Sequence, residues 1–268
     1  MLNIQIIGER NSNPSPNHMA VTISGASMET PTVMAYPITE QTRRDWDVTG
    51  QGNNVDCYVY TRSNSDRLPE AVSRSNDNDV PLVIVATGLE LDALDELQTL
   101  GIIAPNTSMT VLNALRACLG YSNPDLSSVE IEDHHQETKR DVSGTALLLA
   151  QRLQLVHNNL GVEIKKFRDR NLSRSRFEEV PVAGHFAGHI VRFLGSNGDL
   201  LNEERMFVLG RREYSFGALS VAQYASEAYK EGAKGITHIF DIKDQIRPVQ
   251  TSKVTPYETD VCYCGYNH

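Results

Sequence analysis

Residues 127–155 read SSVEIEDHHQETKRDVSGTALLLAQRLQL, and they combine a strand pattern and a helix pattern around a loop of ionisable side chains. Val129 to Glu132 alternates apolar and acidic residues, which predicts a half-buried strand. From Gly144 onward, Leu149, Leu153 and Val156 recur on one helical face, so a helix is predicted to begin there. This succession of strand, loop and helix is the clearest local pattern in the sequence, and the other predicted elements are placed around it.

Ser143, Gly144 and Thr145 form the predicted N-terminus of that helix. Unpaired backbone N–H groups and two hydroxyls meet there at the positive end of the helix dipole, which favours an anion. Between the predicted strand and this terminus lie His134, His135, Lys139, Arg140 and Asp141. A carboxylate bound at Ser143–Thr145 would lie beside a proton donor and a cation, so the stretch predicts a small anionic substrate. The alternatives are plain helix caps at Ser143 and Thr145 and a structural role for the histidine pair.

Length and charge limit the possible functions. The 268 residues suffice for one large domain or two ordinary ones. No apolar run approaches the roughly 20 residues that cross a bilayer, and no signal peptide is visible at the N-terminus, so we expect a cytoplasmic protein without a membrane partner. A net charge of −9 argues against nucleic acid as a partner. Lys139 and Arg140 supply the local positive charge that an anion would need.

Two pairs of residues in the sequence have a spacing that could indicate a metal site. Cys57 and Cys118 lie in strand-like and helical runs, which predicts buried, reduced thiols. Cys262 and Cys264 offer two thiolates, whereas a structural zinc site takes four ligands. The spacing from His185 to His189 would suit a metal pair on a helix, but the surrounding glycines and β-branched residues favour a strand. The sequence therefore predicts no metal.

The N-terminal half predicts strands that alternate with helices, and hence a parallel sheet. Residues 3–8 form a strand that ends in Gly8, but residues 9–17 contain two prolines and no glycine, so the usual phosphate-binding turn is absent. Predicted strands follow at 19–24, 32–36, 55–60 and 80–86. Predicted helices lie at 39–47, 69–75, 89–100 and 110–120.

The C-terminal half predicts a different pattern. Gly161 is expected to end the helix that begins at Gly144. Residues 163–167 form a strand, 168–178 a charged loop or lid, and the end of 180–193 a strand. A hairpin turn at 195–198 leads to a return strand at 202–209, and a helix spans 219–231.

The paired histidines, the Lys-x-Asp sequence and Ser143-Gly144-Thr145-Ala146 resemble the substrate loop of the dihydrodipicolinate reductase (DapB) family of lysine biosynthesis. That family carries His-His-x-x-Lys-x-Asp-Ala-Pro-Ser-Gly-Thr-Ala. Here Lys139 comes one residue later, and the Ala-Pro before the serine is reduced to Val142, so the overall span is kept.

Further segments between about residues 55 and 245 match the same family in order. They are Thr61-Arg62, Ala86-Thr87-Gly88, Ala104-Pro105-Asn106, the strand that contains His189 (without the family's preceding Glu), Arg211 to Ala218, and Phe240-Asp241-Ile242. The resemblance implies catalytic roles for His134, His135 and Lys139. It implies substrate binding by Ser143, Gly144, Thr145, Arg140 and Arg211. It also implies cofactor binding by Gly8, Thr61, Thr87, Gly88, Pro105 and Asn106.

The implied fold is α/β. A reduced Rossmann-like parallel-sheet domain would comprise residues 1–109 and 220–268. An α+β substrate and oligomerisation domain with a mixed, mostly antiparallel sheet would comprise residues 110–219, and the assembly would be a homotetramer or homodimer.

The implied reaction is a reduction by NADH or NADPH of a cyclic imine or dihydropyridine carboxylate. The altered first loop leaves an alternative open. The protein would then have lost the cofactor and would catalyse a cyclisation, dehydration or isomerisation by His/Lys acid–base chemistry in a specialised biosynthetic pathway.

Overall fold

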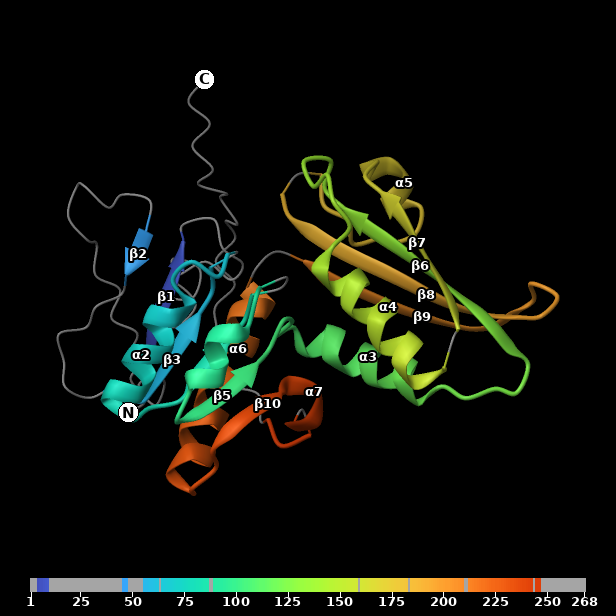
Figure 1. Cartoon of the computed structure of the whole chain (residues 1–268). Helices are drawn as coiled ribbons and strands as arrows, with labels where there is room; N and C mark the ends of the chain where they lie inside the picture. Colours follow the sequence, from blue (N-terminus) through green and yellow to red (C-terminus); the bar gives the residue numbers. More distant parts are fainter. Residues whose placement is uncertain are drawn as a thin grey trace. The chain divides into compact units, whose positions relative to one another are not determined.

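The computed structural model describes residues 4–9, 45–47, 55–62, 64–86, 89–158, 160–182, 184–209, 212–242 and 244–246 (Figure 1). The chain divides into two compact units after Ser108 and again after Gly210. The first unit thus has a second segment that starts at residue 211, so residues 212–219, which the sequence analysis assigned to the substrate domain, belong to the first unit.

The first unit contains a six-stranded sheet in the order β10-β5-β4-β3-β1-β2. All of its strands run parallel except β2, which pairs antiparallel with β1. The strands are β1 (Ile4–Glu9), β2 (Asp45–Asp47), β3 (Cys57–Tyr60), β4 (Leu82–Ile84), β5 (Leu100–Ile103) and β10 (Gly235–His238). The expected Rossmann-like parallel sheet is therefore confirmed.

Helices cover both faces of this sheet. Tyr58 and Tyr60 pack on one face against α2 (Leu68–Asn78), next to the short 3-10 helix η2 (Asp92–Glu96). Their strand neighbours alternate toward the other face, where α6 (Arg212–Lys230) contacts β3 and β4. After α6 the chain forms β10 and then the short helix α7 (Ile239–Ile242). Both faces are buried, which explains the nearly continuous apolar character of these strands.

Three predicted elements of this unit differ in the structure. The helix expected over 39–47 is wrong at its end, because β2 occupies Asp45–Asp47. The amphipathic stretch 89–100 forms only η2, and Leu100 already begins β5. Helix α6 begins at Arg212 instead of Leu219. In each case tertiary contacts outweigh a short periodic pattern.

The second unit contains a four-stranded sheet in the order β7-β6-β8-β9. Strands β6 (Leu126–His135) and β7 (Gly161–Phe167) pair in parallel, and β8 (Phe186–Gly195) and β9 (Leu200–Leu209) add antiparallel pairs. Helices α3 (Met109–Gly120) and α4 (Gly144–Val156) pack together against this sheet. The predicted mixed, mostly antiparallel sheet is confirmed.

Several boundaries in this unit depart from the sequence prediction. Strand β6 continues through the histidine pair, which was expected in the loop. Leu149 and Leu153 are buried as predicted, but Val156 is exposed. Gly161 begins β7, and α4 ends at the C-cap His157 instead. The expected loop 168–178 contains the short helix α5 (Arg170–Arg174).

Cys57 and Cys118 are free and buried, as predicted, and burial raises the pKa of both thiols, that of Cys118 to about 12. The predicted strands 19–24 and 32–36, and the pair Cys262 and Cys264, lie outside the described residues. Among the helices that the structure describes, none has the length and apolar character needed to cross a membrane.

Candidate active site in the second unit

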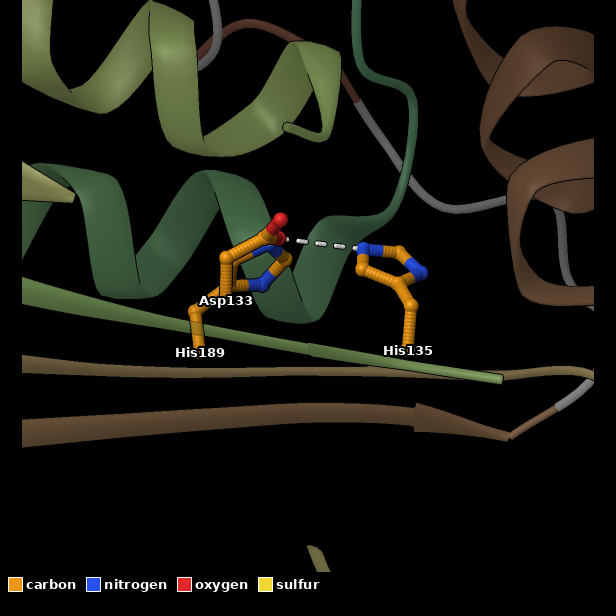
Figure 2. A group of neighbouring side chains, drawn as sticks. All are labelled: Asp133, His135 and His189. Carbon is orange, nitrogen blue, oxygen red and sulfur yellow. Dashed lines mark ion pairs between the residues drawn. The ribbon is translucent and has the colours of Figure 1, made fainter. Parts of the chain in front are cut away.

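Asp133, His135 and His189 point from one face of the second sheet toward the helices (Figure 2). Asp133 and His135 are two residues apart on β6, so the strand alternation places them on the same face. The antiparallel register sets Asp133 directly opposite His189 on β8. All three side chains are buried, with exposed fractions of 0%, 5% and 1% in that order.

Their polar atoms converge on one carboxylate oxygen. The Nε2 atoms of His135 and His189 each lie 3.2 Å from Asp133 Oδ1. Among the described residues, Asp133 Oδ1 and both ring nitrogens of His135 have no partner with hydrogen-bond geometry, and neither does His189 Nδ1. The three side chains are therefore close and buried without satisfying one another.

Ser143 joins this cluster to α4. Its backbone N–H donates to Asp133 Oδ2 over 3.0 Å, and its Oγ lies 3.0 Å from His189 Nε2. The same Oγ accepts the N–H of Ala146 over 3.0 Å, so Ser143 is the N-cap of α4. The helix cap expected from the sequence is present, and it lies at the buried cluster.

The combination of Ser143, His189 and Asp133 does not form a hydrolase relay. Such a relay needs the serine on one ring nitrogen and the carboxylate on the other. Here both Ser143 Oγ and Asp133 Oδ1 face the same nitrogen, Nε2 of His189. The serine is therefore placed as a cap and a hydrogen-bonding group, and not as an activated nucleophile.

Arg168, just after β7, holds the loop between β6 and α4. Its Nη2 lies 2.7 Å from Asp133 Oδ2, and the guanidinium also donates to the carbonyls of Asp133, Lys139 and Asp141. One side chain thus neutralises the buried carboxylate and fixes the cationic loop beside it. The sequence analysis placed Arg168 only in a charged loop.

Protonation in the cluster is set by burial and by these neighbours. Burial alone would raise the pKa of Asp133, but its close contacts with the imidazoles of His135 and His189 outweigh burial and hold that pKa far below its usual range. Burial lowers the pKa of His135 to about 4, although Asp133 opposes this shift. His135 is therefore neutral at pH 7 and presents one N–H and one lone pair.

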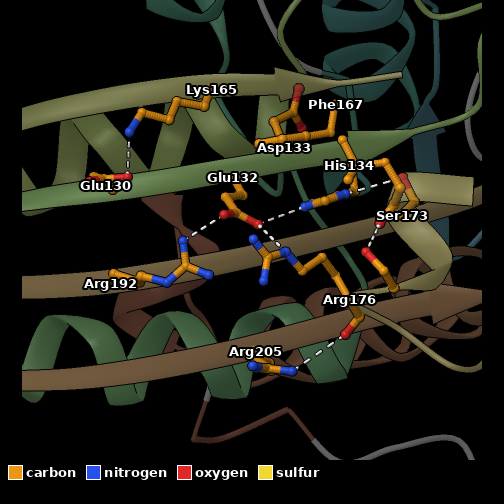
Figure 3. Close-up of polar contacts among 12 residues, drawn as sticks. Glu130, Glu132, Asp133, His134, Lys165, Phe167, Ser173, Arg176, Arg192 and Arg205 are labelled. Atoms are coloured by element: carbon orange, nitrogen blue, oxygen red, sulfur yellow. Dashed lines mark hydrogen bonds and ion pairs between the residues drawn. The ribbon is translucent and has the colours of Figure 1, made fainter. Parts of the chain in front are cut away.

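His134 lies on the opposite face of the sheet (Figure 3). Its Nε2 is 2.9 Å from Glu132 Oε2 and its Nδ1 is 3.1 Å from Ser173 Oγ, so both nitrogens are engaged. Its ring stacks on Phe167 and meets the edge of Phe177. Burial lowers the pKa of His134 despite Glu132. The structure thus separates His134 from His135 and Ser143.

The glycine that replaces the family's Glu before His189 has a structural reason. Gly188 lies opposite His134 in the register, and a Cβ at Gly188 would come within 2.7 Å of Phe177. Phe177 fills the space over His134, so a longer side chain at residue 188 would not fit. This departure from the family pattern belongs to the packing around His134.

The other predicted substrate residues surround the cluster. Lys139 is half-buried, and its charge contributes to the lowered pKa of His135, so it lies within electrostatic reach of that ring. Gly144 and Thr145 are half-buried in the first turn of α4, whereas Arg140 is exposed. Arg211 lies outside the described residues.

The predicted cofactor residues belong to the first unit. Thr61 follows β3 and donates its N–H to Ile7 O over 2.8 Å. Pro105 and Asn106 follow β5, and Asn106 Oδ1 accepts the N–H of Ser108 over 2.9 Å. Gly8 pairs with Trp46 within the sheet. Carboxyl ends of parallel strands share one edge, so Thr61 and Asn106 lie at the same edge of the sheet. Thr87 and Gly88 lie outside the described residues.

Sequence reasoning did not assign Asp133, Arg168 or His189 to the site. The strand alternation could have placed Asp133 on the face of His135, had β6 been extended through the histidines. The pairing of Asp133 with His189 depends on a register between strands more than 50 residues apart, which no local pattern encodes.

Comparison with known proteins gives a consistent picture. No protein-family model matches the sequence. The chain is 28% identical over 208 residues to a 4-hydroxy-tetrahydrodipicolinate reductase from Clostridium novyi (strain NT), which spans 71% of this chain and 77% of the relative. Among solved structures, a mutant meso-DAP dehydrogenase from Clostridium tetani E88, determined with DAP, superposes with a TM-score of 0.50 at 9% identity and covers 94% of this chain and 97% of its own. A C. glutamicum DAP dehydrogenase in complex with DAP has a TM-score of 0.49 at 10% identity over 90% of this chain and 93% of its own.

Proposed function

We propose, from the premise that this chain is a divergent relative of the dihydrodipicolinate reductases, that it reduces a C=N or C=C bond of a small cyclic carboxylate with NADH or NADPH. The observation that carries the proposal is the buried group at the start of α4, in which Asp133 contacts both His135 and Ser143. The similarity to the Clostridium novyi reductase extends over 208 residues and supports the substrate class.

The start of α4 suits a substrate carboxylate. Backbone N–H groups in the first turn carry partial positive charge, and the Thr145 hydroxyl lies in that turn. Neutral His135 can donate a hydrogen bond there without a second charge. Lys139 and Arg140 add cations in the same loop. We assign the carboxylate to Ser143–Thr145 and its immediate surroundings.

Lys139 is our candidate proton donor. A reduction of C=N adds a hydride to carbon and a proton to nitrogen, so the site needs one acid beside the electrophilic bond. Lys139 is cationic, half-buried and electrostatically coupled to His135. His134 is less suited, because Glu132 and Ser173 engage both of its nitrogens on the other sheet face.

Among the described residues, those at the edge of the first sheet suit the nicotinamide end of a dinucleotide. Thr61, Pro105 and Asn106 follow parallel strands at the sheet edge where such cofactors bind, and they would hold the nicotinamide end, which supplies the hydride. The pyrophosphate end would meet residues 9–17, whose sequence lacks glycine. We therefore assign no residue to the pyrophosphate.

The missing glycine turn favours a second candidate function. Without a nucleotide, the same carboxylate site with Lys139 and His135 would catalyse a cyclisation, dehydration or isomerisation by proton transfer. That reaction exchanges protons only and needs no hydride donor. Either activity would belong to a biosynthetic route distinct from ordinary lysine biosynthesis, and either is compatible with a homotetramer or homodimer.

Calorimetric titration separates the two functions. The purified chain is titrated with NADH and NADPH, each with and without pyridine-2,6-dicarboxylate as the probe of the carboxylate site. Nucleotide binding in the micromolar range supports the reductase. Binding of the dicarboxylate alone would overturn hydride transfer and leave the acid–base enzyme.

Variants then locate the carboxylate. Lys139→Met is expected to weaken dicarboxylate binding at least about tenfold, because one cation beside an anion contributes on the order of 1.4 kcal/mol. Lys234→Met, at an exposed lysine of the first unit, is the control and should bind as the wild type does. Equal affinities for both variants would remove Lys139 from the site.

A further inference from the structure

Asp133, His135 and His189 have the composition of a metal site that the proposed reductase does not require. Two imidazoles and one carboxylate are ligands for Zn²⁺ and for other divalent transition metals. The candidate ligand atoms of these three residues all lie within 4.8 Å of one another. They come from adjacent strands, so the sheet backbone fixes their positions (Figure 2).

The distances suit ligands around one ion. Zn²⁺ bonds of about 2.0–2.1 Å in a tetrahedron separate neighbouring ligand atoms by about 3.3 Å. Each histidine Nε2 lies 3.2 Å from Asp133 Oδ1. Side chains that simply hydrogen-bonded to each other would align an N–H with the oxygen, but Asp133 Oδ1 and His135 Nε2 have no hydrogen-bond partner among the described residues. Two buried polar atoms, Asp133 Oδ1 and His135 Nε2, thus lie close together without a hydrogen bond, as two ligands of one ion would.

The hydrogen bonds around Asp133 leave its Oδ1 atom available to bind an ion. Arg168 and the Ser143 N–H both bind Asp133 Oδ2, which leaves Oδ1 for an ion and orients the carboxylate.

We propose that Asp133 Oδ1, His135 Nε2 and His189 Nε2 bind one divalent transition-metal ion, with Zn²⁺ as the best fit. Three protein ligands leave a fourth position, which water or the carboxylate of a bound substrate would fill. Ser143 Oγ lies 3.0 Å from His189 Nε2 and would hydrogen-bond to that fourth ligand. This departs from the absence of a metal expected from the sequence, where His189 was considered only with His185. The site stands on its own geometry and does not depend on hydride transfer.

Metal binding is measured directly on the full chain without an affinity tag. The protein is treated with a chelator, exchanged into clean buffer and titrated with ZnCl₂ by calorimetry. We expect one Zn²⁺ per chain with a submicromolar Kd. NMR on wild-type protein labelled with ¹⁵N-histidine follows the ring nitrogens. Two Nε2 resonances should shift when Zn²⁺ is added. Absence of stoichiometric binding, or unchanged ring nitrogens, would overturn the site.

Variants identify the ligands. His189→Gln is expected to weaken Zn²⁺ binding at least about 100-fold, and His135→Gln should act similarly. His185→Gln is the matched control, because this histidine lies near His135 but outside the three-ligand group. Equal loss in the control, or undiminished binding in folded His189→Gln, would refute the assignment. The wild-type NMR signals decide the question if a ligand variant fails to fold. NADH and NADPH are also titrated into the zinc-free and the zinc-loaded chain. Loss of nucleotide binding would count against the reductase, whereas loss of Zn²⁺ binding would count against the metal site.

Discussion

Arg168 Nη2 lies 2.7 Å from Asp133 Oδ2, and the same guanidinium donates to four backbone carbonyls, three of them on β6 and in the loop after it. Asp133 is fully buried and Arg168 largely so, with side-chain exposed fractions of 0% and 18%. This pair therefore links the end of β6 to the loop that carries Lys139 and Arg140. Arg168, just after β7, thus helps to position the cationic loop.

We expect Arg168→Ala to lower the free energy of unfolding by about 3 kcal/mol, because it leaves a buried carboxylate without its cation and frees four carbonyls. Arg168→Lys should recover only part of this loss, since an ammonium cannot reproduce the planar fork. Urea unfolding measures both effects. Lys234→Ala is the control, with an expected cost below about 0.5 kcal/mol for an exposed side chain. An Arg168→Ala variant as stable as this control would show that the pair has no structural role.

His134 is expected to affect stability more than ligand binding. His134→Gln removes the ring that stacks on Phe167 and bonds to Glu132, so we expect a loss of about 1–3 kcal/mol in urea unfolding. Its affinity for pyridine-2,6-dicarboxylate should stay within about twofold of the wild type, whereas His135→Gln should lose about tenfold or more. A stable His134→Gln protein that no longer binds the dicarboxylate would restore the role that the family resemblance implies.

The sequence predicts the existence of most strands and helices but not how they bring side chains together. The strand at Val129 and the helix from Gly144 follow from period-2 and period-3.6 patterns, and Ser143 follows from capping chemistry. The histidine pair falls outside the strand pattern, because Asp133, His134 and His135 are consecutive polar residues and end the alternation of apolar and polar side chains. Only the register with β8 reveals that Asp133 faces His189 while His134 faces away. Long-range pairing of this kind leaves no local signal.

The stability of the second unit should rise with pH between about 4 and 6.5. Burial lowers the pKa of His135 to about 4 from an ordinary value of 6.5, so in this window the unfolded chain binds a proton that the folded chain does not. The unfolding free energy then increases as that proton is lost, by roughly 3 kcal/mol in total, and is flat above the window. Urea unfolding in chelator from pH 4.5 to 8 measures the slope. His135→Asn should reduce this slope by up to about one proton. An identical slope in wild type and His135→Asn would contradict the assignment.

Gly217 in α6 is required by a close approach within the first unit. A Cβ at this position would lie 1.5 Å from Thr107 O, which is far inside van der Waals contact. The same contact brings Thr107 Oγ1 within 2.7 Å of Tyr214 O and Ser108 Oγ within 2.5 Å of Glu213 Oε1. Helix α6 therefore fixes the segment that follows β5 and includes Asn106, one of the proposed cofactor residues.

We expect Gly217→Ala to destabilise the protein by about 2–4 kcal/mol, because the helix must move away from Thr107 and both hydrogen bonds are strained or lost. If the reductase proposal holds, NADPH affinity should fall at least about tenfold, since the segment that carries Asn106 shifts with it. Gly120→Ala is the matched control: nothing lies within 4 Å of its added Cβ, and alanine should be neutral or stabilise the end of α3 by up to about 1 kcal/mol. Urea unfolding and calorimetry measure the two effects separately. Wild-type stability in Gly217→Ala would show that the segment after β5 yields easily and is not fixed by α6. Lost stability with unchanged nucleotide affinity would instead remove Asn106 from the cofactor site.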